Sequence, residues 1–164
     1  MPDVEELGEG EPREVVVENA RRKARAGAQV HAGALVIGGD TEVVVEGRLL
    51  GKAAGEAEAR SHLETLSGRT HEVLGGLVLL DANGSVRSGV VSTSVTFKPL
   101  DDATVELYIA SGEWRDRAGA YAIQGLGSIL IDRLEGDFSN VVGFPVGLLL
   151  DLAPELGLKR DVAG

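Results

Sequence analysis

The carboxylate of Asp40 has the setting best suited to chemistry in this sequence. It follows the short apolar run 34–37 and two glycines, Gly38 and Gly39. An apolar run of this length predicts a buried strand, and glycines let a ligand approach the backbone closely. We therefore expect Asp40 at the end of a strand, where it can hold Mg²⁺ or accept a proton from an attacking water. The alternative is an Asp in an ordinary turn, and spacing alone leaves both interpretations open.

Lysines and N-terminal carboxylates offer further groups for a phosphorylated ligand. Lys52 lies twelve residues after Asp40, and a hairpin between them would return it to the same edge, where an ammonium suits a polyphosphate. Lys23 lies near the apolar stripe of a basic helix. Either Glu5 or Glu6 can complete a magnesium site with Asp40, because magnesium usually takes one or two carboxylates plus substrate oxygens. The alternatives are a solvated loop lysine, a solvated helix face and a flexible acidic terminus.

Segment 112–127 is a glycine-rich stretch with acidic, basic, aromatic and amide side chains. A simple connection between two elements does not need so many polar and charged side chains, so this loop is a candidate for function. Gln124 can both donate and accept hydrogen bonds, as reading a nucleobase edge requires, although a turn that serves folding alone is the alternative. His71 has no second histidine nearby, so we expect a structural role for it. No residue set resembles a Ser-His-Asp triad, a Walker loop or a dinucleotide fingerprint.

Helical and strand patterns predict the elements that position these groups. A helix begins at Pro12 and ends at Gly27, a strand covers 34–37, and Glu46-Gly47 forms a hairpin turn. Further along we expect a helix over 54–66, strands over 71–80 and 86–97 joined by Asn83-Gly84, a helix from Asp101 to about Ala110, a strand over 127–131 and a helix from Pro145. This order predicts one layered α/β domain over residues 1–164, with a mixed, twisted β-sheet flanked by helices.

The charge balance restricts the class of partner. The 164 residues include 16 basic and 26 acidic side chains, and the net charge of −10 disfavours binding to nucleic acid or to anionic membranes. A phosphorylated small molecule would need a metal ion or a few focused cations. The sequence has no cysteine, no apolar stretch as long as a membrane span and an acidic start unlike a targeting peptide. We therefore expect a soluble cytoplasmic protein.

Five motifs in a fixed order resemble those of one family. The chain is similar to the Maf family of nucleoside triphosphate pyrophosphatases, and the resemblance covers nearly its whole length. The motifs are Gly38-Gly39-Asp40-Thr41, Gly51-Lys52-Ala53, Leu66-Ser67-Gly68-Arg69-Thr70-His71, Arg117-Ala118-Gly119-Ala120-Tyr121-Ala122-Ile123-Gln124-Gly125 and Asn140-Val141-Val142-Gly143-Phe144-Pro145.

The resemblance implies a fold like that of Maf and ITP pyrophosphatases and a metal-dependent hydrolysis. With Mg²⁺ or Mn²⁺, the bond between the α- and β-phosphates of dTTP, UTP or a modified nucleotide would be cleaved to the monophosphate and pyrophosphate. A homodimer is also implied. By position, the resemblance makes Asp40 the general base or metal ligand and Glu6 an acidic group near the metal, gives Lys23 and Lys52 to the substrate's phosphates, and links Thr41 and Gln124 with substrate choice.

The chain also departs from the family's pattern. Family members open with a strand and Ser-x-Ser-Pro-Arg-Arg, which hold the polyphosphate, and this sequence starts after that point, leaving a shortened domain with a neighbouring strand edge exposed. Smaller departures are Gly39, Ala53, Arg117 and Ala122, where the family has Ala, Pro, Lys and Gly. Three hypotheses follow: an active house-cleaning pyrophosphatase, a non-catalytic nucleotide-binding protein with a regulatory role in septum formation, or a start that is internal to a longer protein.

Overall fold

A computed structural model describes residues 3–157 as one sheet with helices against both of its faces. The five strands lie in the order β2-β1-β3-β4-β5, and every pairing among the described residues is antiparallel. The expected layered α/β domain is confirmed, but its sheet is antiparallel throughout rather than mixed. Short hairpins join β1 to β2 and β3 to β4, and such turns connect antiparallel strands. The strands are β1 (Val36–Val45), β2 (Arg48–Leu50), β3 (Thr70–Leu80), β4 (Val86–Phe97) and β5 (Ile131–Glu135).

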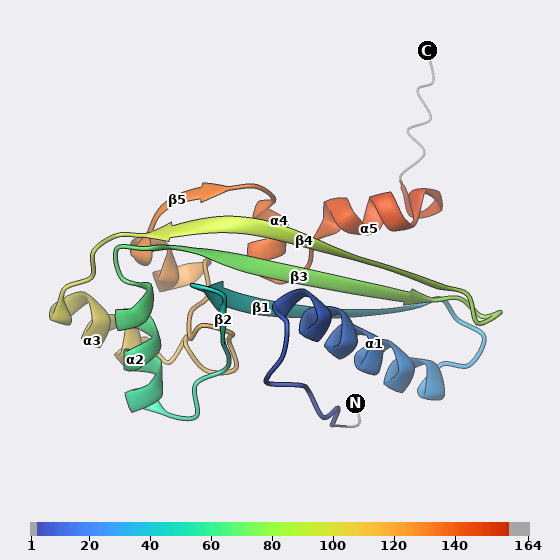
Figure 1. Ribbon diagram of the computed structural model, residues 1–164, viewed down its shortest axis with the longest axis horizontal. Coiled ribbons are helices and arrows are strands. Elements are labelled where there is room, and N and C mark those ends of the chain that lie inside the picture. Colours follow the sequence, from blue (N-terminus) through green and yellow to red (C-terminus); the bar gives the residue numbers. More distant parts are fainter. Residues whose placement is uncertain (1–2, 158–164) are drawn as a thin grey trace, which may run out of the picture.

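The helices divide between the two faces and one end of the sheet (Figure 1). Helix α1 lies along one face against β1 and β3, α4 and α5 lie on the opposite face, and α2 and α3 pack together at one end. None of the helices within residues 3–157 is long and apolar enough to cross a membrane. The helices are α1 (Pro12–Val30), α2 (Glu56–Leu66), α3 (Asp102–Ser111), α4 (Phe138–Val142) and α5 (Val146–Leu152), with 3₁₀ helices η1 (Gly125–Leu130) and η2 (Pro154–Leu156).

Helix α1 begins where the sequence predicts and ends later. Pro12 occupies the first turn, and the Glu11 side chain caps the helix by accepting a hydrogen bond from the Glu14 N–H at 3.0 Å. The predicted end at Gly27 is wrong, because the helix continues to Val30. A Cβ at Gly27 would lie 2.9 Å from Cγ1 of Val36, so this glycine lets the helix pack closely against β1 and does not end it.

Strand β1 runs through the two glycines that were expected to end it. The prediction that Asp40 stands at a strand end is wrong, since β1 stays paired with β3 from Val36 to Val44. A Cβ at Gly38 would lie 2.2 Å from the carbonyl oxygen of Ala20, so the glycine lets α1 pack directly onto the strand. Asp40 therefore projects from the middle of a strand toward α1.

Two predictions near the C-terminus also need correction. Residues expected to form a strand over 127–131 belong mostly to η1, and β5 follows from Ile131. The Glu113 side chain accepts hydrogen bonds from the backbone N–H groups of Leu126 and Gly127, which favours a helical turn there. The five-residue helix α4 was not predicted, because it is too short for an apolar period to be recognised.

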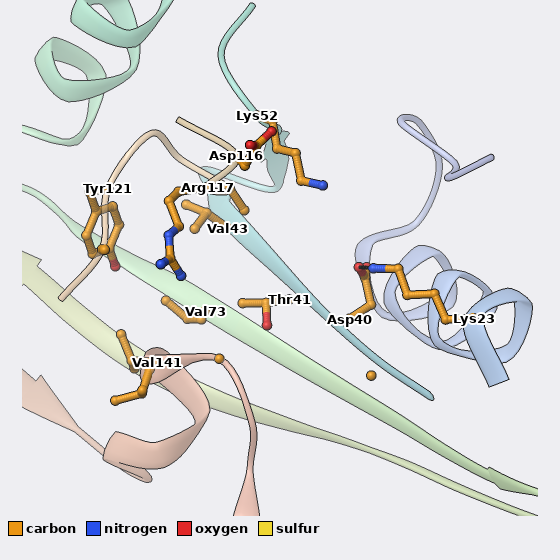
Figure 2. Close-up of a pocket in the computed structure, with 15 residues that line it drawn as sticks. Lys23, Asp40, Thr41, Val43, Lys52, Val73, Asp116, Arg117, Tyr121 and Val141 are labelled. Atoms are coloured by element: carbon orange, nitrogen blue, oxygen red, sulfur yellow. Dashed lines mark hydrogen bonds and ion pairs between the residues drawn. The ribbon is translucent and has the colours of Figure 1, made fainter. Parts of the chain in front are cut away.

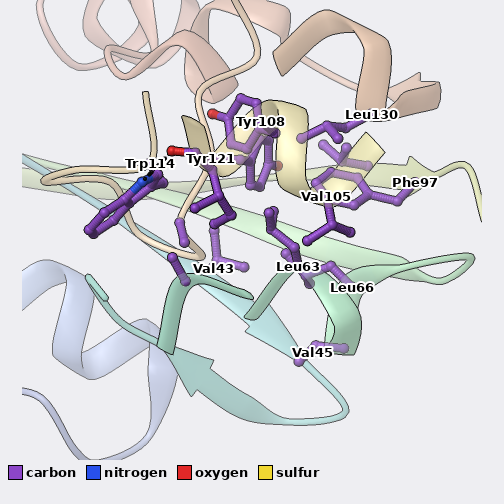
Figure 3. Packing of buried hydrophobic residues seen from close by; sticks show 14 of the residues in the cluster. Val43, Val45, Leu63, Leu66, Phe97, Val105, Tyr108, Trp114, Tyr121 and Leu130 are labelled. Carbon is purple, nitrogen blue, oxygen red and sulfur yellow. Dashed lines mark hydrogen bonds between the residues drawn. The ribbon is translucent and has the colours of Figure 1, made fainter. Parts of the chain in front are cut away.

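The largest group of buried apolar residues lies where α2 and α3 meet the sheet (Figure 3). Phe97 from β4 and Tyr121 pack edge-to-face with centroids 4.8 Å apart, and His71 contacts both rings. The Nε2 atom of His71 lies 2.7 Å from the Tyr121 hydroxyl. Burial lowers the pKa of His71 to about 4, so this histidine is neutral near pH 7 and, as expected, serves the structure.

Candidate active site

A cavity of about 270 Å³ lies between β1, α4 and the loop that follows α3 (Figure 2). Four of the six predicted site residues line it: Lys23, Asp40, Thr41 and Lys52. Glu6 lies in a groove beside β1 that Lys23 and Lys52 also line. Gln124 lines an adjoining cavity, which shares Arg117, Ala122 and Val142 with the first. The fold thus gathers all six predicted residues around two joined cavities and one groove.

An ion-pair chain connects the N-terminal segment, α1 and β1. The Lys23 Nζ lies 2.7 Å from both Glu6 Oε1 and Asp40 Oδ1, and the Lys52 Nζ lies 3.5 Å from Glu6 Oε2. Burial opposes the charge of Lys23, but hydrogen bonds to Asp40 and Glu6 outweigh it and raise the pKa of Lys23. Burial likewise opposes the charge of Glu6, yet Lys23 and Lys52 lower its pKa. Both groups are therefore charged near pH 7.

Asp40 is held in a largely buried carboxylate pair. Its side chain is 5% exposed, and its Oδ2 has no hydrogen-bond partner among the described residues. Glu42 lies two residues along β1 on the same face, and Asn19 Nδ2 donates to its Oε1 at 3.4 Å. Burial first, and then the charge of Asp40, raises the pKa of Glu42 to about 8. Sequence reasoning missed Glu42, although strand alternation from Asp40 could have found it.

Thr41 reaches the same cavity from the other face of β1. Its neighbours there are Val73 and Val141, which form an apolar wall (Figure 2). Strand β2 pairs only with the last three residues of β1, so residues 36–42 have no strand partner on that side within the described residues. Asp40 and Thr41 line the same cavity, so a ligand in it can contact both.

The loop after α3 closes the cavity and brings Arg117 to it. Lys52 and Ala118 form an isolated antiparallel bridge, and the Gly119 N–H donates to the Leu50 carbonyl at 2.9 Å. Gly119 has a φ of +68°, and a Cβ there would lie 3.0 Å from Val43, so only glycine fits. Arg117 lines both cavities, although only the family resemblance singled it out before.

One residue of this loop has a strained backbone. Ala120 adopts a φ of 62°, in the left-handed region that residues other than Gly, Asn and Asp rarely occupy, whereas Asp116 tolerates its φ of 58°. Ala120 is fully buried, and the hydroxyl of Tyr108 accepts a hydrogen bond from the Ala122 N–H at 2.9 Å. The surrounding core thus holds the loop in this conformation, as is common at functional sites.

The residues around Asp40 fit a hard divalent cation in donor type. Glu6 and Asp40 supply carboxylate oxygens, and Asp40 Oδ2 is buried without a partner in residues 3–157. Magnesium usually binds one or two carboxylates and completes its shell with water and substrate oxygens. In the described part of the chain, no three acidic or histidine side chains gather closely enough to form a complete protein cage. The Lys23 ammonium lies between the two carboxylates, so a cation there would compete with it.

Comparisons with known proteins agree with the arrangement of the motifs. A family profile described as Maf-like protein matches residues 1–156. A dTTP/UTP pyrophosphatase of Deinococcus radiodurans is 44% identical over 157 residues, which are 96% of this chain and 80% of that protein. A dTTP/UTP pyrophosphatase of Halalkalibacterium halodurans is 49% identical over 133 residues, which are 81% of this chain and 70% of that protein.

A third relative gives the same result. A dTTP/UTP pyrophosphatase of Pyrococcus horikoshii is 41% identical over 147 residues, covering 90% of this chain and 78% of that protein. The profile match spans nearly the whole chain, and the resemblance drawn from the five motifs is confirmed. The chain belongs to the Maf-like protein family.

Proposed function

We propose that this protein hydrolyses dTTP or UTP to the nucleoside monophosphate and pyrophosphate. The observation that carries the proposal is the placement of Asp40, a buried carboxylate on a rigid strand, in a cavity that Lys23 and Lys52 also line. The names of the relatives support the substrate class, since the three proteins compared above are all dTTP/UTP pyrophosphatases.

Three cations can bind the polyphosphate. Lys52 is half-exposed and its contact with Glu6 is 3.5 Å long, so its ammonium can turn to a phosphate oxygen. Arg117 lies at the junction of the two cavities, where a guanidinium can bind two phosphate oxygens at once. Lys23 is already paired with Asp40 and Glu6, and it holds those carboxylates in place until a substrate binds.

In the proposed reaction, Asp40 accepts the proton of the attacking water. The water oxygen bonds to the α-phosphorus, the bond from that phosphorus to the bridging oxygen breaks, and pyrophosphate leaves with the bonding electrons. Asp40 Oδ1 is paired with Lys23, so we assign the proton to Oδ2, which is buried and has no hydrogen-bond partner among the described residues. A divalent cation held by Glu6 and Asp40 would withdraw charge from the phosphate oxygens. The walls around Thr41 and Val141 would limit the entry of other water.

Base recognition would take place in the adjoining cavity of about 420 Å³, where Gln124 lies beside Ile123. An amide can pair with a carbonyl and an N–H on the same base edge, which uracil and thymine both present. Thr41 would contribute to substrate choice from the first cavity. We further propose that the protein acts as a homodimer in the cytoplasm, and sedimentation of the purified protein tests the dimer.

The test is pyrophosphate release from dTTP, UTP, CTP and GTP with Mg²⁺ or Mn²⁺, comparing wild type with Asp40→Asn. We expect release from dTTP and UTP, and a loss of at least about 100-fold in kcat in Asp40→Asn, because general base catalysis contributes about 10²–10⁴-fold. Asp151→Asn is the matched control, since Asp151 is exposed on α5 far from the cavity. Its rate should equal that of the wild type.

Two results would contradict the proposal. Equal rates for Asp40→Asn and wild type, with the fold intact by circular dichroism, would remove the assigned role of Asp40. Calorimetric binding of UTP by wild type without any pyrophosphate release would favour the non-catalytic, regulatory hypothesis instead. Chelation of divalent ions with EDTA tests the cation, and full activity in EDTA would exclude it.

A further inference from the structure

The Glu113 carboxylate holds the start of η1 although it belongs to a different part of the chain. Its Oε2 accepts a hydrogen bond from the Leu126 N–H at 3.0 Å, and its Oε1 accepts one from the Gly127 N–H at 3.3 Å. Leu126 and Gly127 are the second and third residues of η1. These are the amides that a helix leaves without a partner and that a capping side chain normally satisfies.

Gln124 occupies the capping position of η1 but does not cap it. Its backbone is extended, with φ −80° and ψ 165°, and its side chain makes no hydrogen bond to the helix amides. Ser, Thr, Asp or Asn at this position would turn its side chain inward to the helix. Since Glu113 satisfies these amides, the exposed Gln124 amide is available to face the adjoining cavity.

Glu113 is itself fixed in place. It follows Gly112, which ends α3 with a φ of +72°, and it precedes Trp114, whose indole N–H donates to the Ile109 carbonyl at 3.1 Å. Trp114 is 5% exposed, so the segment is anchored in the core. Gly125 completes the fit, because a Cβ there would lie 3.0 Å from both carboxylate oxygens of Glu113. Contacts of Trp114 with the core and of Glu113 with η1 therefore connect the core to the segment that carries Gln124.

We propose that Glu113 is a positioning residue for base recognition, which caps η1 in place of Gln124 and so leaves the Gln124 amide free for the nucleobase. This inference rests on the proposed function. Glu113 also lines the adjoining cavity, but each of its oxygens already accepts a backbone N–H. Its effect on the base therefore passes through Gln124 rather than through a contact of its own.

The first experiment needs no turnover. Hydrogen exchange of the Leu126 and Gly127 amides, and the heteronuclear NOE of the Gln124 side-chain amide, are measured by NMR in wild type, Glu113→Ala and Glu113→Gln. We expect faster exchange and a lower NOE in Glu113→Ala, and partial recovery in Glu113→Gln, which keeps one acceptor oxygen. Ser128→Ala is the matched control, because Ser128 Oγ donates to the Gly125 carbonyl in the same turn without contacting Glu113.

The second experiment separates positioning from general loss of structure. With UTP and CTP as substrates, Glu113→Ala should raise KM for UTP about tenfold and lower the preference for UTP over CTP by a similar factor. The kcat should change less than about twofold, because the lost base contact stabilises the bound substrate and the transition state equally. In a Gln124→Ala background, Glu113→Ala should cause no further loss of preference. Residues that act as one unit show such non-additive effects.

The outcomes distinguish this inference from the proposed function. Absence of pyrophosphate release by wild type would overturn the proposed function, while the NMR comparison would still decide the role of Glu113. An unchanged Gln124 NOE in Glu113→Ala would overturn the inference. Additive losses in the double variant, or a lower melting temperature with unchanged UTP preference, would also overturn it, because either result means that Glu113 acts independently of Gln124.

Discussion

The Lys23 ammonium lies 2.7 Å from Asp40 Oδ1, and it reaches that oxygen from α1 across the face of β1 (Figure 2). Gly38, two residues before Asp40 on the same face, lets α1 lie against the strand. The ion pair therefore depends on the packing of a helix against a strand as well as on the two charges. The same ammonium binds Glu6, so it ties three segments of the chain together.

Lys23→Met should destabilise the fold. The change leaves the buried Asp40 and the half-buried Glu6 without their shared cation, and we expect a loss of about 1–2 kcal/mol in unfolding free energy. Urea unfolding at neutral pH measures it. In an Asp40→Asn background the Lys23→Met change should cost less, since no buried charge is then left unpaired. Equal losses in both backgrounds would contradict the assigned pairing.

Lys52→Ala should weaken substrate binding without affecting stability. Lys52 is 52% exposed and its contact with Glu6 is long, so we expect a change within about 0.5 kcal/mol in unfolding free energy. KM for UTP should rise about tenfold, because one charge-assisted hydrogen bond to phosphate is lost. Lys98→Ala is the control, since Lys98 is exposed outside the cavity. A wild-type KM in Lys52→Ala would remove Lys52 from the phosphate site.

Gly38→Ala should separate α1 from the sheet. The new Cβ would lie 2.2 Å from the Ala20 carbonyl oxygen and 2.5 Å from the Ala24 nitrogen, both backbone atoms that cannot move alone. We expect a loss of about 2–3 kcal/mol in stability, as for an overpacked core, together with reduced activity because Lys23 shifts from Asp40. Gly51→Ala, where a Cβ meets nothing within 4 Å, should change stability by less than about 0.5 kcal/mol.

His71 should make the fold sensitive to acid. Burial lowers the pKa of His71 from 6.5 to about 4. Between these two pH values, His71 is protonated in the unfolded chain and neutral in the folded chain. Its contribution to stability is complete above pH 6.5 and is lost as the pH falls toward 4, by up to about 3 kcal/mol. Urea unfolding from pH 7 to 4 should show a shallower loss for His71→Gln than for wild type. The exposed His31→Gln variant should keep the wild-type slope.

Replacing Asn140 with Asp should destabilise the fold more than replacing it with Ala. Its side-chain amide donates to the Val73 carbonyl at 2.9 Å and lies 3.2 Å from Thr93 Oγ1, holding α4 against the sheet. Asn140→Ala loses these bonds and should cost about 2–3 kcal/mol. Asn140→Asp keeps the shape but places an acceptor against the carbonyl, so its midpoint in thermal unfolding should be lower still. The reverse order would contradict the donor role.

Much of the fold follows from local patterns. Residues close in the sequence decide the turns at Glu46-Gly47 and Asn83-Gly84, the start of α1 at Pro12, the cap at Asp101 and the strands β3 and β4. The errors occur where a distant segment changes the outcome. Gly38 and Gly39 were expected to end a strand, but pairing with β3 continues through both, and α1 packs directly on Gly38.

The 3₁₀ helix η1 shows the same limitation. Its residues have an apolar pattern that suits a strand, and the acceptor that favours a helical turn comes from Glu113, more than ten residues earlier. A window of neighbouring residues does not contain such a partner. Strand alternation places Glu42 on the face of Asp40, but its burial there also depends on α1 and Asn19.

The sequence by itself determined the family motifs, the strand and helix content and the residue types able to handle phosphate, metal and base. The reason is that turn chemistry, caps and side-chain charge are properties of short segments. Tertiary structure alone decided which groups meet. Lys23, Asp40, Lys52 and Arg117 come from α1, β1, the segment after β2 and the loop after α3, and only the packing of these elements brings their side chains around one cavity.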